Sequence, residues 1–137
     1  HGNNFLKTML RLSLQQPDKQ LTVVNDQFGS PTWSKTLAAQ IIVIIKKEAQ
    51  GVFHASSEGH CCWYELAMAF LKEMGVDHNI EPCTSDEYPT PTERPVNSIL
   101  ENQHLKNINL NLFENWRDEL SGFVKEYKNL LIEEAVS

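Results

Sequence analysis

The sequence predicts an α/β fold that forms one part of a larger protein, with helices alternating with short strands. Amphipathic stretches of helical period recur along the chain, and short β-branched or apolar segments separate them. Apolar residues make up 41% of the chain and charged residues 22%, which is an ordinary globular composition. The predicted strands are few and short for an open sheet, so we expect them to complete a sheet that begins elsewhere.

The first predicted helix begins after Asn3 or Asn4, either of which can cap it. Apolar residues recur at helical spacing over 5–12, and Pro17 with Asp18 ends the helix. Residues 20–27 (QLTVVNDQ) then alternate and are rich in β-branched side chains. They predict a strand that ends near Asp26, followed by a turn over 28–32 (FGSPT).

A second helix is predicted to begin at Thr32 or Ser34 and to end before Gly51, with two lysines in its last turn. Residues 41–45 (IIVII) form the longest apolar run and would also suit a buried strand. The length of the segment favours a helix that is buried on most of its sides.

The middle of the chain predicts a short strand over 51–56 (GVFHAS) and a third helix over about 63–75, which Gly75 ends. Cys62 and Glu65 occupy the two positions of a capping box, although sulfur is a weaker acceptor there than a hydroxyl. Residues 79–85 (NIEPCTS) predict an edge strand, because the proline cannot join a central ladder.

The C-terminal third predicts a short strand around 97–100, a brief helix near 102–107 and a long helix over 113–131 with one apolar face. The tail 132–137 (IEEAVS) is expected to fray.

Charge and cysteine content narrow the possible partners. The net charge of −6 argues against nucleic acid, and the longest apolar run is too short for a membrane span. No targeting segment is visible, and three cysteines with one adjacent pair make a poor disulfide framework. We therefore expect a cytoplasmic location. Cys61 and Cys62 are neighbours and no second pair exists, so neither a structural zinc site nor a cysteine nucleophile is predicted.

Residues 88–100 (YPTPTERPVNSIL) form the first candidate binding loop. Their three prolines restrict the backbone, so the loop can hold Arg94 ready for a ligand. The guanidinium is a planar fork that suits phosphate or carboxylate. The alternative is a rigid surface connector in which Arg94 pairs with Glu93 or Glu101.

Residues 25–32 (NDQFGSPT) form the second candidate. A strand end, a glycine turn and a helix start would place Gln27, Ser30 and Thr32 beside free N–H groups, which attract anions. The alternative is an ordinary strand–turn–helix connection with Thr32 or Ser34 as the cap. The residues alone leave both alternatives open and indicate no reaction.

Five segments together carry a family resemblance: 2–12 (GNNFLKTMLRL), 23–32 (VVNDQFGSPT), 51–67 (GVFHASSEGHCCWYELA), 88–100 and 112–120 (LFENWRDEL). In order and spacing they resemble the C-terminal part of the dTDP-4-dehydrorhamnose reductases, which are extended short-chain dehydrogenases/reductases with a Rossmann-like fold. The resemblance covers residues 2 to about 131. An epimerase of the same superfamily fits less well, because epimerases usually have a different, arginine-containing sequence where this chain has DQFGSPT.

The resemblance implies an enzyme that reduces dTDP-6-deoxy-L-lyxo-4-hexulose to dTDP-L-rhamnose with NADPH or NADH. Its cofactor and its catalytic Tyr-x-x-x-Lys pair would belong to an N-terminal Rossmann domain absent from this chain. None of the three tyrosines here has a lysine four residues later. Residues 1–137 are thus expected to be the sugar-nucleotide-binding portion, with no catalytic residue and no activity alone. The alternative is a non-catalytic nucleotide-sugar-binding or regulatory module.

By similarity to the family, Asn4 and Arg94 would meet the diphosphate, while Gln27 and the turn 29–32 would line the nucleotide side of the cleft. The full set of expected substrate-binding residues is Asn4, Phe5, Gln27, Gly29, Pro31, Thr32, Arg94 and Asn97.

The resemblance also bears on metals and assembly. Some family members dimerise through magnesium held by an acidic residue just after the Pro-Thr pair, where this chain has Lys35, so no metal is predicted. Without the N-terminal domain, 34–47 and 51–56 would expose apolar surface, and we expect the isolated chain to oligomerise or swap elements.

Overall fold

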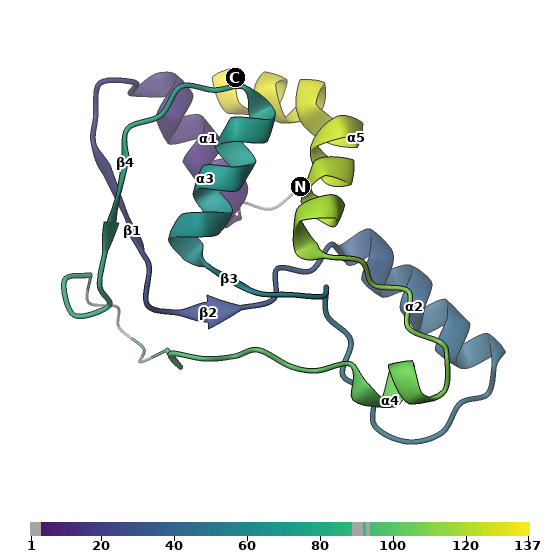
Figure 1. Ribbon diagram of the computed structural model, residues 1–137. Helices are drawn as coiled ribbons and strands as arrows, with labels where there is room; N and C mark the ends of the chain where they lie inside the picture. Colours follow the sequence, from purple (N-terminus) through teal and green to yellow (C-terminus); the bar gives the residue numbers. More distant parts are fainter. Residues whose placement is uncertain (1–3, 89–91, 93) are drawn as a thin grey trace.

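The computed structural model describes residues 4–88, 92 and 94–137, which form five helices and four short strands (Figure 1). In chain order the elements are α1 (Phe5–Gln15), β1 (Leu21–Val24), β2 (Phe28–Gly29), α2 (Ser34–Lys46), β3 (Cys61–Cys62), α3 (Trp63–Met74), β4 (Ile80–Cys83), α4 (Gln103–Asn107) and α5 (Trp116–Val136). Within this part of the chain, no helix is both long and apolar enough to cross a membrane.

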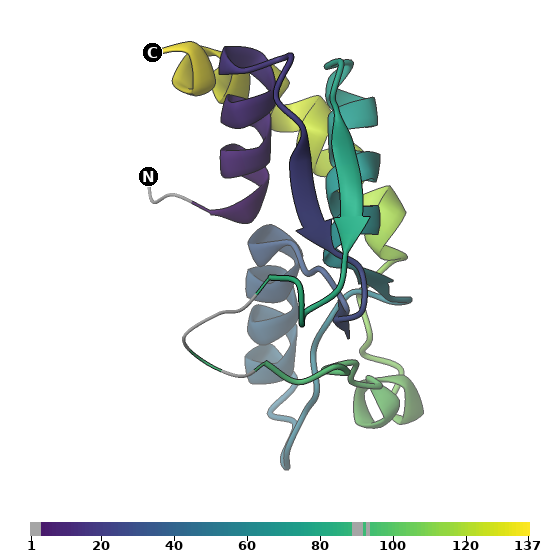
Figure 2. The same ribbon diagram turned by 90° about the vertical axis from the view of Figure 1, so that its left-hand side faces the viewer.

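The strands form two separate pairs. β1 and β4 run parallel and side by side, with Leu21 opposite Ile80 and Val24 opposite Cys83 (Figure 2). β2 and β3 run antiparallel, with Phe28 opposite Cys62. The predicted strands at 20–27 and 79–85 are confirmed in shortened form.

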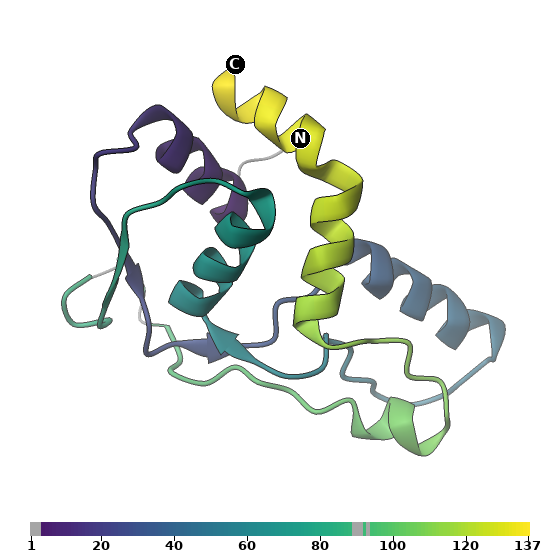
Figure 3. The ribbon, with the colours of Figure 1, turned by 45° about the horizontal axis from the view of Figure 1, so that its top comes forward.

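The core lies among α1, α3 and α5, and β1 packs against α3 at its edge (Figure 3). Leu10, Phe70 and Leu71 are fully buried at its centre, and Trp116 and Val124 close it from α5. Burial of one such large apolar side chain contributes about 1.5–3 kcal/mol, so this cluster is the main source of stability.

The predicted helix starts are confirmed for α1 and α3. Asn4 caps α1, since its Oδ1 accepts a hydrogen bond of 2.9 Å from the Lys7 backbone N–H. The capping box of α3 is complete: Cys62 Sγ accepts from the Glu65 N–H at 3.5 Å, and Glu65 Oε2 accepts from the Cys62 N–H at 2.9 Å. Gly75 ends α3 with a φ of 69°, which favours glycine. The brief helix near 102–107 is confirmed as α4.

The prediction of strands at 51–56 and 97–100 is wrong. A strand needs a partner for its backbone groups, and residues 51–56 have no strand beside them in the described chain. Phe53 instead stacks on His104, with ring centroids 4.5 Å apart. In the second segment only Asn97 forms a bridge, to Phe28. The segment 28–32 begins with β2, so it is not a turn throughout.

The prediction that the second helix is buried on most sides is also wrong. Gln40 is its one buried residue, and Ile41, Ile42 and Ile45 are 47%, 51% and 67% exposed. The helix leads away from α1 and α3 (Figure 1). Its N-cap is Trp33, with no side-chain cap, rather than Thr32 or Ser34.

The last helix is displaced towards the C-terminus relative to the prediction. It begins at Trp116 instead of residue 113, and the tail that was expected to fray is helical to Val136. Packing explains the added turn, because Ala135 is buried and its carbonyl accepts a hydrogen bond of 3.0 Å from Gln15 Nε2 on α1.

Candidate functional site

Three adjoining hollows bring most of the predicted site residues together. The first, of about 350 Å³, is lined by residues that include Phe5, Gln27 and Arg94. The second, of about 180 Å³, shares Gln27 with the first and adds Gly29 and Pro31. The third, of about 230 Å³, shares Pro31 with the second and adds Asn4 and Thr32. We refer to the three hollows together as the cleft.

The first hollow combines aromatic surface with one cation. Phe5 and Trp63 meet edge to face with ring centroids 4.9 Å apart, and Tyr88 also lines this hollow. Arg94 is the only charged side chain among the described residues of the lining. Flat aromatic surface beside a guanidinium suits a ligand that carries both a planar ring and a phosphate.

Arg94 is exposed, and it takes part in none of the ion pairs found between described residues. Glu101, one suggested partner of Arg94, lies 2.6 Å from Lys106 Nζ. Glu93, the other, and the prolines at 89 and 91 lie outside the described residues. The stiffness of this loop therefore stays a prediction, whereas the position of Arg94 at the cleft is observed.

Gln27 is held by a short chain of hydrogen bonds that joins the segment between β1 and β2 to the loop after β4. Its Nε2 donates to Ser85 Oγ at 2.9 Å, and Ser85 Oγ donates to Asp26 Oδ1 at 2.7 Å. The Ser85 backbone N–H also donates to Asp26, 2.9 Å from Oδ2. Hydrogen bonds from the Ser85 side chain and backbone lower the pKa of Asp26, so its carboxylate is ionised at neutral pH.

The turn at 29–33 is braced by a buried carboxylate from α5. Glu119 Oε2 accepts hydrogen bonds from Ser57 Oγ at 2.6 Å and from the Trp33 N–H at 3.3 Å. Thr32 Oγ1 accepts from the Ser57 N–H at 3.1 Å and donates to the Ser30 carbonyl at 3.0 Å. The hydroxyl of Thr32 is thus engaged by the protein and builds the wall of the cleft.

Glu119 was not among the residues predicted from the sequence. A signal was present, because Glu119 lies one residue before Leu120 and three after Trp116, on the apolar face of the last helix. A charged residue on a buried face needs a polar partner, which here is Ser57.

Gly29 and Asn97 differ in their relation to the cleft. A side chain at Gly29 would bring its Cβ within 2.9 Å of Ser98 Oγ, so a larger residue there would displace this hydroxyl, which donates to the Phe28 carbonyl at 3.1 Å. Asn97 is exposed and outside the linings of the three hollows, and its Oδ1 accepts from the Ile99 N–H at 2.9 Å. Its backbone instead supports β2.

Asn4 lies at the third hollow with its Oδ1 used as the cap of α1. Its amide nitrogen is the part of the side chain that can face a ligand, and this group can only donate.

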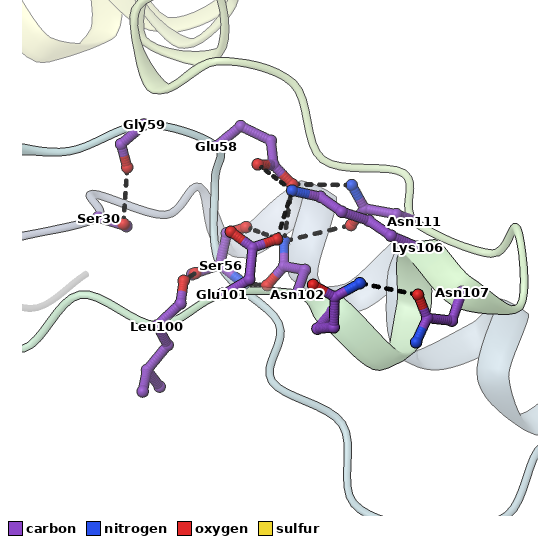
Figure 4. A network of polar contacts seen from close by, with 11 residues as sticks. Ser30, Ser56, Glu58, Gly59, Leu100, Glu101, Asn102, Lys106, Asn107 and Asn111 are labelled. Atoms are coloured by element: carbon purple, nitrogen blue, oxygen red, sulfur yellow. Dashed lines mark hydrogen bonds and ion pairs between the residues drawn. The ribbon is translucent and has the colours of Figure 1, made fainter.

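A polar network supports the far side of the braced turn (Figure 4). Glu58 Oε2 accepts from Lys106 Nζ at 2.7 Å, and Glu58 Oε1 accepts from Asn111 at 2.9 Å and Asn102 at 3.2 Å. Burial raises the pKa of Glu58, but these hydrogen bonds and the Lys106 charge outweigh it and leave the pKa below its usual value. The next residue, Gly59, accepts from Ser30 Oγ at 2.7 Å, so the network anchors the turn to α4.

Metal ligands and reactive thiols are not part of the cleft as described. The described residues contain no group of three side chains that could hold a metal. Lys35 forms an ion pair with Glu126 and lies 4.9 Å from the Trp33 ring centroid. Burial raises the pKa of Cys61 to about 12, which makes it a poor nucleophile.

A larger hollow of about 920 Å³ lies elsewhere, along the outer face of α3, and holds none of the predicted site residues. It is open and lined by a mixture of acidic and basic side chains, among them Glu65, Lys72 and Arg117. We therefore assign the candidate site to the cleft, where the predicted residues converge.

Comparison with known proteins identifies the chain's relatives. A family model described as the RmlD substrate binding domain matches residues 1–129. The chain belongs to this family.

Three curated relatives include one protein named for polysaccharide biosynthesis and two named as dTDP-sugar reductases. The spore coat polysaccharide biosynthesis protein SpsK of Bacillus subtilis is 36% identical over 125 residues, covering 91% of this chain and 43% of the relative. A dTDP-4-keto-6-deoxy-D-glucose reductase of Streptomyces niveus is 34% identical, covering 88% and 42%. The dTDP-4-dehydrorhamnose reductase of Escherichia coli K12 is 32% identical, covering 91% and 45%. The chain thus spans less than half the length of these relatives.

Solved structures agree in fold. A dTDP-4-dehydrorhamnose reductase from Clostridium acetobutylicum superimposes with a TM-score of 0.85 at 36% identity, covering 95% of this chain and 44% of that one. The reductase from Bacillus anthracis, solved in complex with NADP, gives 0.86 at 32% identity, covering 92% and 44%. The predicted resemblance and the α/β fold class are confirmed.

Proposed function

We propose that this RmlD domain is the sugar-nucleotide-binding portion of a dTDP-4-dehydrorhamnose reductase. The whole protein would reduce the 4-keto group of dTDP-6-deoxy-L-lyxo-4-hexulose to give dTDP-L-rhamnose. The observation that carries the proposal is the convergence of Arg94, Gln27 and the aromatic side chains on one cleft, in a chain whose relatives include dTDP-sugar reductases.

Binding is the part of the reaction that this chain performs. The exposed guanidinium of Arg94 would hold the diphosphate through two parallel charge-assisted hydrogen bonds, worth about 1.5–3 kcal/mol. The Asn4 amide would donate to the ligand from the start of α1. Phe5 and Trp63 would cover the flat face of the base, and Gly29, Pro31 and Thr32 would form the wall beside it. Asn97 would act through the backbone support that it gives to β2.

The reduction itself belongs to the part of the protein outside these residues. NADPH or NADH, bound there in a Rossmann domain, supplies the hydride. Support for this assignment comes from the Bacillus anthracis relative, which was solved with NADP. The role of this chain is to hold the sugar nucleotide so that its 4-keto carbon faces that domain. The described cysteines are all free thiols, which suits the reducing cytoplasm that we propose as its location.

Calorimetric titration with dTDP and with dTDP-rhamnose tests the proposal. Arg94→Ala should weaken binding of both by tenfold or more, about 1.4 kcal/mol. Arg11→Ala is the matched control, because Arg11 is an exposed arginine on α1 outside the lining of the cleft. Equal affinities of the two variants for dTDP, or no binding by the folded chain, would contradict the proposal.

A further inference from the structure

The hydrogen bonds around Ser85 determine which way the Gln27 amide faces. The ionised carboxylate of Asp26 can only accept, so the single hydroxyl proton of Ser85 is committed to Asp26. Ser85 Oγ must then accept from its other neighbour, which is Gln27 Nε2 at 2.9 Å. The reversed amide would set two acceptors against each other with no proton between them. The donor end of Gln27 therefore faces Ser85.

This orientation leaves the Oε1 of Gln27 as an acceptor at the junction of two hollows. Gln27 lines both the 350 Å³ and the 180 Å³ hollow, and no described residue is recorded as donating to its Oε1. Trp63 lines the same two hollows and is 37% exposed. A planar ring lying against Trp63 would thus present its edge to Gln27, and a group that can donate belongs there.

We propose that Gln27 Oε1 accepts the N3–H of the thymine base, and that Asp26 and Ser85 are positioning residues that hold this acceptor in place. The inference rests on the proposed function, because it takes the ligand to be a dTDP-sugar. A thymine attached through N1 has a single ring donor, N3–H, flanked by two carbonyl acceptors. The second Nε2 proton of Gln27 can reach one of these carbonyls. The same arrangement would favour thymine and uracil over cytosine, whose N3 is an acceptor and would oppose Oε1.

A double-mutant cycle between protein and ligand tests the contact. The ligands are dTDP, its N3-methyl derivative and its 3′-deoxy derivative, each titrated calorimetrically into the wild-type chain and Gln27→Ala. N3-methylation should weaken wild-type binding by about tenfold or more but binding to Gln27→Ala by less than about twofold. Removal of the 3′-hydroxyl should weaken binding to the wild-type chain and to Gln27→Ala by the same factor.

Two further variants sharpen the test. Ser85→Ala keeps Gln27 but removes the hydrogen bond that orients its amide. The N3-methylation penalty, which is the loss of affinity caused by N3-methylation, should then lie between the values for the wild type and for Gln27→Ala. Gln50→Ala removes an exposed glutamine outside the cleft and should leave the penalty unchanged. If Gln27→Ala does not fold, Gln27→Met keeps the side-chain length without the amide and should give the same loss of penalty.

The outcomes separate this inference from the proposed function. A methylation penalty that persists in Gln27→Ala, or coupling of Gln27 to the 3′-hydroxyl instead, would overturn the N3 assignment while Arg94-dependent dTDP binding remained. Absence of dTDP binding by the folded chain would overturn both.

Discussion

Glu119 offers a sharp test of how the cleft wall is held, because one of its oxygens is engaged and the other is not. Glu119 is 6% exposed, its Oε2 accepts from Ser57 and Trp33, and its Oε1 has no hydrogen-bond partner among the described residues. Glu119→Leu keeps the approximate volume and removes both hydrogen bonds. The double variant Ser57→Ala/Glu119→Leu also removes the donor that would be left behind.

The magnitudes follow from the two distances. The 2.6 Å bond from Ser57 is charge-assisted, and its loss together with an unsatisfied hydroxyl should cost about 2–4 kcal/mol. The 3.3 Å hydrogen bond from the Trp33 N–H is near the upper distance limit for such bonds, so its loss adds little to the destabilisation. Replacing both partners by apolar groups is nearly neutral in many proteins, and here it also removes the unpartnered Oε1. The double variant should therefore be within about 1 kcal/mol of wild type.

Urea unfolding followed by circular dichroism measures these free energies, with Glu119→Gln as the isosteric control. Glu119→Gln keeps one acceptor for Ser57 and should cost less than Glu119→Leu. A double variant that is as unstable as Glu119→Leu, or more so, would refute the idea that the Ser57 hydroxyl is the group that Glu119 satisfies.

Three other properties can be measured directly. The pKa of Asp26 in the folded protein lies below its unfolded value near 3.8. Its ionised form therefore stabilises the fold above that pH, and this contribution is lost as the pH falls through the folded pKa. Asp26→Asn should reduce the dependence of the unfolding free energy on pH, measured below about pH 4. The isolated chain should associate as its concentration rises in size-exclusion chromatography, and Ile41→Lys/Ile45→Lys should shift it towards monomer, whereas a monomeric wild type at all concentrations would contradict this expectation. Cys61 should resist iodoacetamide at pH 8 until denaturant is added, and rapid labelling of the native protein would show that it is less buried than described.

Helices could be predicted where their signals are local. Asn4, the Cys62–Glu65 pair and Gly75 act on backbone groups within a few residues, so the ends that they set for α1 and α3 were predictable. The last turn of α5 was not, because it depends on Ala135 packing against α1, far away in the sequence. The prediction of a strand at 51–56 fails for a related reason. These residues have β propensity, but no other strand of the described chain lies beside them to pair with.

The candidate site shows the same difference between residues marked by local motifs and residues brought together by tertiary contacts. Gln27 and Arg94 belong to short motifs, and the structure places both at one hollow, although residues 27 and 94 are far apart in sequence. The partners that hold Gln27 and Thr32 were not predictable, because Ser85, Ser57 and Glu119 come from other segments. A single sequence indicates which side chains suit a ligand, whereas the residues that orient them depend on the tertiary contacts.

The contact between α1 and the end of α5 also determines when the domain can finish folding. Lys7 pairs with Glu134, 127 residues later, and Gln15 reaches the carbonyl of Ala135. Contacts between residues this far apart in sequence form late, because the loop that they close is long. During synthesis at roughly 5–20 residues per second, α1 waits roughly 6–25 s for the last turn of α5. Over that interval the apolar face around Leu10 lacks part of its cover, and the nascent chain is most exposed to aggregation or chaperone capture.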